Sequence, residues 1–362
     1  MHEPHVRLNR ETSVYLDVVR LAAALVVMFG HLAGARFTGG FLWPLGAVMD
    51  DAVTIFFVLS GFVIGHATMG RPVSAREYMV ARAARIFSVA LPALVLTFAL
   101  DAAGRELRPD LYTHAWGYVA DGRLWQFTCG VLFANQLWWL NVPPGSDLPY
   151  WSLGYEVWYY VLFGLVMFTP GRRRWPLVVG GLLLVGPKIA VLFPLWLLGL
   201  AANRICAGVV FRRDVGWLLC VCGPLAGVGL LLVLRGMGPI TVGGPDLMRS
   251  YVLGIAFAAH IIGFRAISAS FGWALLPFTG AIRWTAGATF TIYLMHLPVA
   301  QFLIAVLPSP ALTMGARLAL LGLTLAVLYL LAEVTERRKR VWARGIGALV
   351  GTARAAKQQQ IV

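Results

Sequence analysis

Three polar residues interrupt the first long apolar run of the chain, residues 14–33: Asp17, Arg20 and His31. A charged side chain at membrane depth costs about 2.5 to 3.5 kcal/mol on insertion scales, so such groups face a partner, a cavity or a substrate path. On an ideal helix, Arg20 and His31 lie about 20° apart around the axis and roughly 16 Å apart along it. One helix face therefore carries a cation near one membrane surface and a titratable base towards the other.

His31 has the side-chain chemistry of a general base or an acyl carrier. A neutral imidazole can take a proton from a hydroxyl group or accept an acyl group near neutral pH. The alternative, for a lone histidine within a membrane, is a ring that is hydrogen-bonded to a neighbouring backbone carbonyl. Asp17 and Arg20 are one helical turn apart, so they also have a simple alternative, which is to pair with each other.

A second pair of cations stands at the inner mouth of the third apolar run, where Arg82 and Arg85 are three residues apart. This spacing puts both guanidinium groups on one helix face. Because arginine makes bidentate contacts with phosphate, Arg82, Arg85 and Arg20 predict an anion pocket that opens to the cytoplasm. A positive-inside anchor of the helix is the alternative for the pair.

Three further residues within apolar runs are candidate site residues. Glu156 lies at the start of the fourth apolar run, on the outer side and at the level of His31. An acid there can orient the imidazole or bind a sugar hydroxyl. The alternative is an exposed acid at the membrane interface, which would have no role. Ser60, in a Ser-Gly step, lets a second backbone or a narrow acyl chain approach its helix, although packing alone also explains this step. His296 precedes Pro298, which kinks the helix, so His296 serves either the site or the broken backbone.

The composition indicates a membrane protein. Of 362 residues, 59% are hydrophobic and 13% are charged, whereas soluble proteins have about 25% charged residues. We therefore expect an all-α polytopic membrane protein with about ten transmembrane helices, and a re-entrant or interfacial segment, rich in Trp, near 129–140. The expected spans are 14–33, 51–68, 86–103, 152–169, 175–187, 189–203, 216–234, 251–267, 286–306 and 314–333; the fifth and sixth can instead form one bent hairpin.

The distribution of Lys and Arg predicts the orientation. Basic residues concentrate in alternate connections and in the tail, so we expect both termini in the cytoplasm. The expected organisation is a cytoplasmic segment 1–13, one transmembrane domain 14–334 and a basic cytoplasmic tail 335–362. The first apolar run is expected to be an anchor rather than a removed leader. The formal charge of +14 then needs no nucleic acid as partner, because cytoplasmic loops and a tail that can lie on anionic lipid account for much of it.

The four cysteines predict no metal site. Cys220 and Cys222 are two apart in an apolar run, where helical geometry points them to different faces. Buried apolar thiols are expected instead for Cys129, Cys206, Cys220 and Cys222.

Five motifs occur in a fixed order along most of the chain. They are Tyr15-Leu16-Asp17-x-x-Arg20 followed by His31, the stretch FFVLSGFVI at 56–64, Arg82-x-x-Arg85-Ile86, Trp151-Ser152-Leu153-x-x-Glu156 through Tyr160, and Tyr293-Leu294-x-His296-x-Pro298. Together they resemble the acyltransferase-3 family of bacterial integral membrane O-acyltransferases, from about residue 15 to residue 333. The chain departs from the family pattern at Val18, Val19, Leu21 and Ser88, which leaves the subfamily and the acceptor open.

The resemblance implies transfer of an acyl group, usually acetyl, from a cytoplasmic coenzyme A thioester to a hydroxyl of a glycan or a small glycosylated molecule, as in polysaccharide modification. It implies acetyl-CoA or another acyl-CoA as co-substrate, no tightly bound cofactor, and a location in the bacterial cytoplasmic (inner) membrane. By this analogy His31 is the catalytic base or a transient acyl carrier, and Glu156 assists at the acceptor. Arg20, Arg82 and Arg85 would hold the donor phosphates, and Asp17, Ser60, Tyr293 and His296 would support substrate or structure.

A transporter or flippase of a glycoconjugate or anion is the competing function. In such a protein the same intramembrane charges form a proton relay or lead an anion through the bilayer. The absence of a pair of broken helices that recurs in the two halves of the sequence argues against it. A scaffold without activity gains nothing from intramembrane His and Arg.

Overall fold

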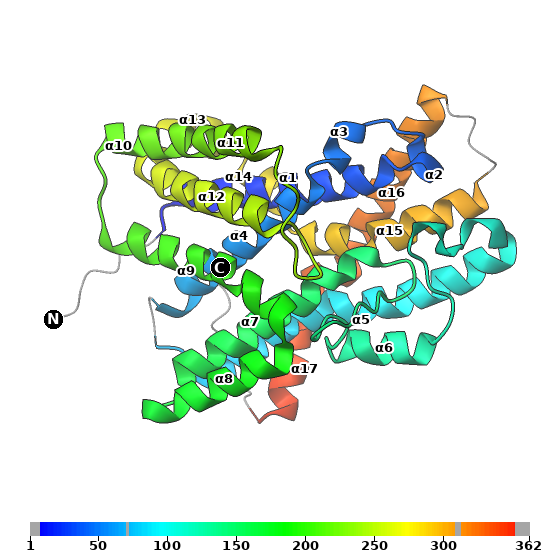
Figure 1. The fold of residues 1–362 in the computed structure, drawn as a ribbon, viewed down its shortest axis with the longest axis horizontal. Helices are drawn as coiled ribbons and strands as arrows, with labels where there is room; N and C mark the ends of the chain where they lie inside the picture. Colours follow the sequence, from blue (N-terminus) through cyan, green and yellow to red (C-terminus); the bar gives the residue numbers. More distant parts are fainter. Residues whose placement is uncertain (1–7, 70–71, 308–312, 352–362) are drawn as a thin grey trace. The chain divides into compact units, whose positions relative to one another are not determined.

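The protein is described by a computed structural model that covers residues 8–69, 72–307 and 313–351. Every regular element in these ranges is a helix, and no strand occurs in them (Figure 1). Eight helical segments of the described chain are long and apolar enough to cross a membrane. The expectation of an all-α polytopic membrane protein is therefore confirmed.

Two of the ten expected spans are not among these eight segments. α7 (Trp151–Phe168) coincides with the expected span 152–169, but Glu156 and several tyrosines make it less apolar than the others. α8 (Arg174–Val185) has 12 residues, and at about 1.5 Å per residue it is well short of a hydrocarbon core of about 30 Å. It ends at Gly186, whose φ of 78° favours glycine.

The segment 129–140, which was expected to be re-entrant or interfacial, is helical only at its beginning. α6 (Arg123–Val131) ends early in it, and the chain then continues through turns in which Phe133 and Trp138 have positive φ. Trp138 and Trp139 are exposed, as side chains at a membrane interface would be. A re-entrant or interfacial role of this segment stays a prediction.

The chain forms two compact units, each assembled from segments that are distant in sequence. α1 (Arg10–Leu32) begins in unit 1 and ends in unit 2. Unit 1 consists of Met1–Ala23, Asp50–Val73 and Pro187–Ala286, and unit 2 consists of Ala24–Met49, Ser74–Gly186 and Gly287–Val362.

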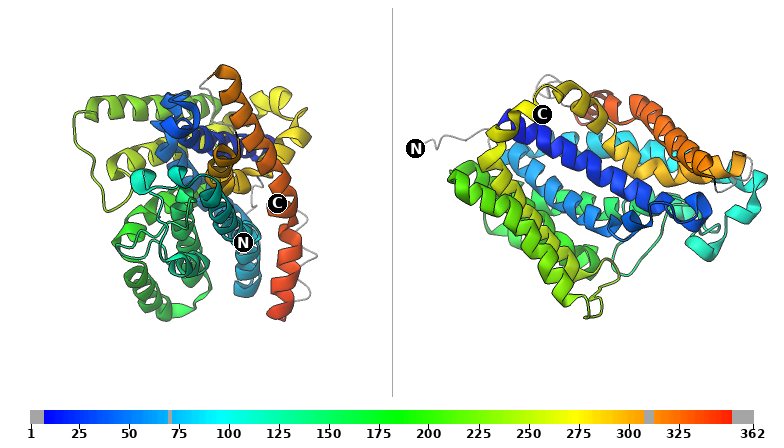
Figure 2. Two further views of the ribbon diagram at one scale, coloured as in Figure 1. Left: turned by 90° about the vertical axis from the view of Figure 1, so that its right-hand side faces the viewer. Right: turned by 90° about the horizontal axis from the view of Figure 1, so that it is seen from above.

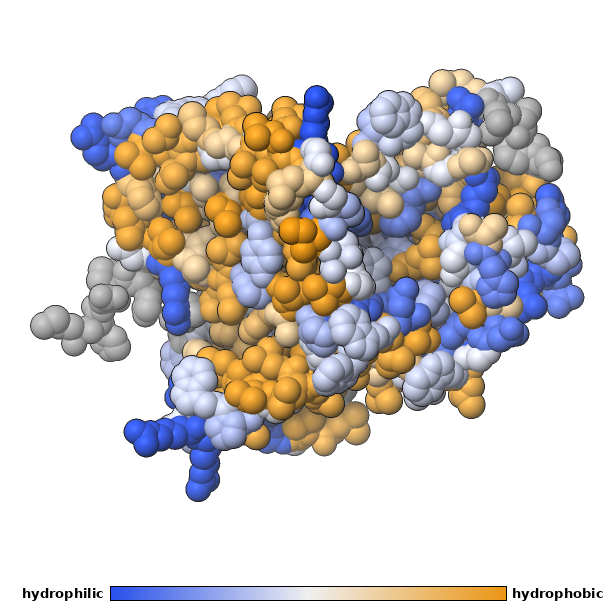
Figure 3. Space-filling model, in the orientation of Figure 1, coloured by the Kyte–Doolittle hydropathy of each residue, from blue (hydrophilic) through white to orange (hydrophobic). Residues whose placement is uncertain are grey.

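In unit 1, α4 (Met49–Met69) packs closely against α9 (Pro187–Gly208). α11 (Gly223–Leu234) and α12 (Leu247–Ile267) lie side by side (Figure 2), and exposed apolar side chains cover the visible face of this pair (Figure 3). The face is therefore suited to lipid. The remaining helices of this unit are α10 (Arg213–Trp217), the π-helical turn η5 (Leu218–Cys222), η6 (Ser268–Phe271), α13 (Gly272–Leu275) and α14 (Thr279–Ala286).

The expectation of buried thiols is correct for three cysteines and wrong for the fourth. Cys129, Cys206 and Cys220 are buried, whereas Cys222 is exposed. The reason is the period of the helix, which turns neighbouring positions of one apolar run to different faces.

In unit 2, the long helix α5 (Ala75–Leu107) begins with a capping box. The backbone N–H of Ser74 donates to the Glu77 carboxylate, and the backbone N–H of Glu77 donates to the Ser74 hydroxyl oxygen. α15 (Thr289–Val306) packs against α5 and against α16 (Met314–Val334). α17 (Lys339–Leu349), which lies in the expected tail, also packs on α5. Two short helices, α2 (Ala35–Thr38) and α3 (Trp43–Gly46), follow α1, and the 3-10 turns of this unit are η1 (Pro109–Leu111), η2 (His114–Trp116), η3 (Leu148–Tyr150), η4 (Gly171–Arg173) and η7 (Glu336–Arg338).

Candidate active site

Two histidines meet in unit 2. His31 lies in the last turn of α1 and His296 lies in α15, and Nε2 of His296 is 3.3 Å from Nδ1 of His31. The ring centroids are 5.1 Å apart. His296 is fully buried, which fixes its ring among packed side chains. Both residues were expected in the site, but their direct contact was not.

Backbone carbonyls determine which ring nitrogens carry hydrogen. Nδ1 of His31 is 2.9 Å from the carbonyl oxygen of Val27, and Nδ1 of His296 is 2.9 Å from that of Ile292. A carbonyl only accepts, so each Nδ1 is an N–H donor in the neutral ring. Nε2 of His296 is then an acceptor that faces the Nδ1–H of His31. Nε2 of His31 keeps its lone pair, which is the group that a general base needs.

The end of α1 that bears His31 is held by its surroundings. A Cβ atom at Gly30 would lie 2.9 Å from the carbonyl oxygen of Leu45 in α3, so glycine at this position allows α3 to pack this close to α1. Thr38 donates a hydrogen bond of 2.7 Å to the carbonyl oxygen of Leu32. These contacts fix the turn that follows His31.

A hydroxyl pair joins α7 to the helix that carries His296. The hydroxyl oxygens of Ser152 and Tyr293 are 2.7 Å apart and buried. Tyr293 lies one turn before His296 on α15, so this hydrogen bond also orients that part of the helix. Tyr293 was an expected support residue. Ser152 belongs to one of the sequence motifs but was not assigned a role.

Glu156 and Arg82 are connected through Tyr160. The Tyr160 hydroxyl donates to the Glu156 carboxylate, and the Arg82 guanidinium carbon lies 5.8 Å from the centroid of the Tyr160 ring. Tyr78, on the same helix as Arg82, donates to the carbonyl oxygen of Tyr160 at 3.0 Å. These contacts place Glu156 next to Arg82, with the Tyr160 side chain between them. Its expected role at the acceptor stays a prediction.

Arg85 lies next to a buried acid that the sequence did not single out. A carboxylate oxygen of Glu336 accepts hydrogen bonds from the backbone N–H groups of Phe290 at 2.9 Å and Thr291 at 3.2 Å, so Glu336 caps the N-terminus of α15. Arg85 interacts electrostatically with Glu336, and its guanidinium carbon is 5.8 Å from the Phe290 ring centroid. In the sequence, Glu336 follows shortly after the last apolar run, 314–333, and this position is the signal that could have identified it.

The remaining expected residues lie in unit 1. Asp17 and Arg20 form an ion pair of 3.2 Å, as the simpler alternative anticipated. Ser60 accepts a hydrogen bond of 3.1 Å from the indole N–H of Trp196, which connects α4 with α9. Arg20 and the pair Arg82 and Arg85 belong to different units, and their joint pocket stays a prediction.

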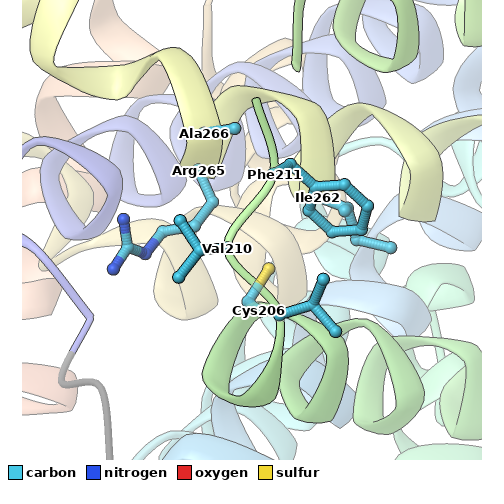
Figure 4. A pocket seen from close by; sticks show the side chains of 7 residues that line it. Cys206, Val210, Phe211, Ile262, Arg265 and Ala266 are labelled. Atoms are coloured by element: carbon cyan, nitrogen blue, oxygen red, sulfur yellow. The ribbon is translucent and has the colours of Figure 1, made fainter. Parts of the chain in front are cut away.

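A small pocket of about 130 Å³ occurs in unit 1, where α9 ends (Figure 4). None of the expected site residues lines it. Its walls come from Cys206, Val209, Val210, Phe211, Ile262, Arg265 and Ala266.

Comparison with known proteins gives one match. Residues 13–333 match the model of a family described as an acyltransferase domain, which is nearly the whole chain. No curated protein and no solved structure matches the chain.

Proposed function

Because the chain belongs to the acyltransferase-3 family, and is therefore a membrane acyltransferase, we propose that it moves an acetyl group from cytoplasmic acetyl-CoA to a hydroxyl of a glycan or a glycosylated small molecule. The observation that carries this proposal is the pair of His31 and His296, with the tautomer of each ring fixed by a carbonyl. Such a pair supplies an unprotonated Nε2 in a buried setting. The proposed location is the bacterial cytoplasmic membrane, with both termini in the cytoplasm.

The proposed step uses His31 as general base. Its Nε2 takes the proton of the acceptor hydroxyl while the hydroxyl oxygen attacks the thioester carbonyl carbon. The new C–O ester bond forms, the C–S bond breaks, and the thiolate of coenzyme A leaves and takes the proton back from His31. Nδ1–H of His31 meanwhile donates to the Val27 carbonyl and faces Nε2 of His296, and both acceptors favour the imidazolium that forms transiently. A transient acyl group on Nε2 is the second form of the same chemistry.

The donor is proposed to bind from the cytoplasmic side. Arg82 and Arg85, with Arg20, would hold the phosphates of coenzyme A through bidentate hydrogen bonds. α1 is one helix from Arg10 to Leu32, so Arg20 and His31 are separated by roughly 16 Å along its axis. An acyl group carried on the pantetheine arm would cross this distance within the protein. The position of Arg20 and His31 on one helix supports this proposed transfer across the membrane.

A transporter or flippase makes a different prediction. It would move a glycoconjugate or anion without breaking the thioester, so it would release no free coenzyme A. An enzyme releases coenzyme A only as fast as the acceptor is acylated.

The test measures free coenzyme A and acetylated product from purified protein, acetyl-CoA and a panel of glycan acceptors. In His31→Asn protein that still binds acetyl-CoA, we expect turnover to fall by roughly 10² to 10⁴-fold, the usual effect of removing a positioned base. His66→Asn, which changes an exposed histidine of unit 1, is the matched control and should keep wild-type turnover. More than about a tenth of wild-type turnover in His31→Asn would move the chemistry away from His31. Wild-type release of coenzyme A without any dependence on acceptor would contradict the proposed function.

A further inference from the structure

Arg36, in unit 2, is a half-buried cation that forms no ion pair with a carboxylate of the described residues. It lies in α2, five residues after His31. None of the ion pairs between described side chains includes it. Its Nε is buried and has no hydrogen-bond partner among the described residues. A guanidinium that loses water without gaining a partner is unfavourable unless another group compensates it.

Aromatic side chains nevertheless hold this guanidinium in a defined position. Its carbon Cζ lies 3.7 Å from the Trp116 ring centroid and 4.4 Å from that of Phe37. Trp116 is itself fixed, because its indole N–H donates to the carbonyl oxygen of Leu111 at 3.0 Å. Burial lowers the pKa of Arg36 to about 10, so the group keeps its charge at neutral pH. The site is thus built around an oriented cation.

The backbone keeps Arg36 next to the proposed base. The N–H of Gly34 donates to the carbonyl oxygen of His31 at 3.1 Å, and that of Phe37 donates to Gly34 at 3.0 Å, so the chain turns tightly between the two side chains. Arg36 and His31 interact electrostatically. A neighbouring element adds a second cation of the same kind: α16 packs against α2, and Nε of Arg317 is buried without a partner among the described residues.

We propose that Arg36 binds an anionic group of the acceptor, a carboxylate or a phosphate, beside the hydroxyl that is acylated. The proposal rests on the proposed function, because it takes His31 as the base and the end of α1 as the acceptor side. The planar fork of arginine matches both anions in a bidentate way. An acidic sugar or a sugar phosphate would supply the anionic partner that the described part of the chain does not provide.

The first test compares related sugars with and without an anionic group: glucose with glucuronate and glucose 6-phosphate, and N-acetylglucosamine with N-acetylmuramate. We expect wild-type protein to have an apparent KM at least tenfold lower for the charged member of a pair, with the better anion showing whether carboxylate or phosphate fits. Arg36→Gln should remove this preference and leave the KM for acetyl-CoA unchanged. Arg36→Lys should keep part of it, since the charge remains but the fork is lost. Arg108→Gln is the control, because Arg108 is an arginine of the same unit that already pairs with Asp110.

The second test needs no activity. Thermal unfolding of purified protein, measured with saturating coenzyme A so that the proposed donor site is occupied, should shift upward with glucuronate or inorganic phosphate but not with glucose, because a ligand that binds the native state stabilises it. Arg36→Gln should lose this shift. Three results for Arg36→Gln would each overturn the proposal. The first is an unfolding shift that persists, the second is an equal loss of turnover with neutral and charged acceptors, and the third is a raised KM for acetyl-CoA. If wild-type protein acylates none of these acceptors, the proposed function fails for them, whereas the unfolding shift still decides whether Arg36 binds anions.

Discussion

At the scale of single residues, backbone carbonyls set the tautomers of the two candidate histidines. The carbonyl of Val27 fixes Nδ1–H in His31, and the carbonyl of Ile292 does the same in His296. Each is the i−4 carbonyl of the same helix, so the helix itself selects the tautomer. The alternative of a histidine bonded to a carbonyl is therefore present in the structure, and it leaves Nε2 of His31 available as a base.

The same scale gives a prediction for the cations on α5. Arg85→Lys keeps a positive charge opposite the buried Glu336, so the protein should fold and insert normally. Lysine lacks the planar fork, so affinity for acetyl-CoA should fall about tenfold if Arg85 holds a phosphate in a bidentate way. Equilibrium binding of acetyl-CoA to purified protein measures this. Arg173→Lys, at an exposed arginine of η4, should bind as the wild type does.

Unchanged donor affinity in Arg85→Lys would have a clear meaning. Arg82 and Arg85 would then be topological anchors that also orient Tyr160 and Glu336. The donor phosphates would have to be held elsewhere.

At the scale of helices, unit 1 depends on a close contact between α4 and α9 at two glycines, one on each helix. A Cβ atom at Gly199 of α9 would overlap the carbonyl oxygen of Val58, and one at Gly61 of α4 would overlap that of Trp196. Small residues allow backbones to approach so closely within a membrane. Ser60, beside Gly61, adds the hydrogen bond from Trp196. The Ser-Gly step of α4 thus serves helix packing.

We expect Gly199→Ala to destabilise the protein. The added methyl group meets backbone atoms that cannot move separately from their helix, and overpacking of this kind typically costs about 1 to 3 kcal/mol. Thermal unfolding of purified protein should therefore begin at a lower temperature. Gly229→Ala is the matched control, because a Cβ atom at Gly229 of α11 has no atom within 4 Å, and alanine there should be neutral or slightly stabilising. An equal effect of both substitutions would contradict the close contact.

At the scale of the whole molecule, the chain has two compact units whose segments alternate along the sequence. α1 contributes Arg20 to unit 1 and His31 to unit 2. Residues of the expected tail fold into unit 2, where α17 packs on α5 and Glu336 caps α15. The C-terminal region therefore stabilises the helix that carries His296.

The proposed sidedness of the membrane can be tested with single cysteines. With both termini in the cytoplasm, the connection between the expected spans 86–103 and 152–169 is an outer connection. In a background with the exposed Cys222 changed to alanine, Asp121→Cys in this outer connection should react with an impermeant thiol reagent in intact cells. Gly345→Cys, where an added Cβ atom has no neighbouring atom within 4 Å, should react only after lysis. The outer connection offers glycines as well, but Gly145 is unsuitable because its φ is 55° and a side chain there would overlap the Asp101 carboxylate. Labelling of Gly345→Cys in intact cells would place the tail outside and contradict the positive-inside assignment.

The sequence by itself determined the class of this protein and most of its helices. Apolar runs long enough to span a bilayer can only be helices there, because every backbone group must be paired within the segment. The candidate site residues were also visible, since charged and titratable groups are rare at that depth. Short or polar segments were less well determined: α8 is too short to span, and 129–140 is mostly turns because Phe133 and Trp138 adopt positive φ.

Only the tertiary structure decided which of these residues meet. His31 and His296 are 265 positions apart, and the stacking of Arg36 on Trp116 and the capping of α15 by Glu336 join segments that no periodic pattern relates. Helical periodicity fixes the face on which a side chain lies, but it carries no information on which other helix packs against that face. That choice depends on the combined fit of many side chains in the folded units, so the contacts of the site follow from packing and not from local sequence.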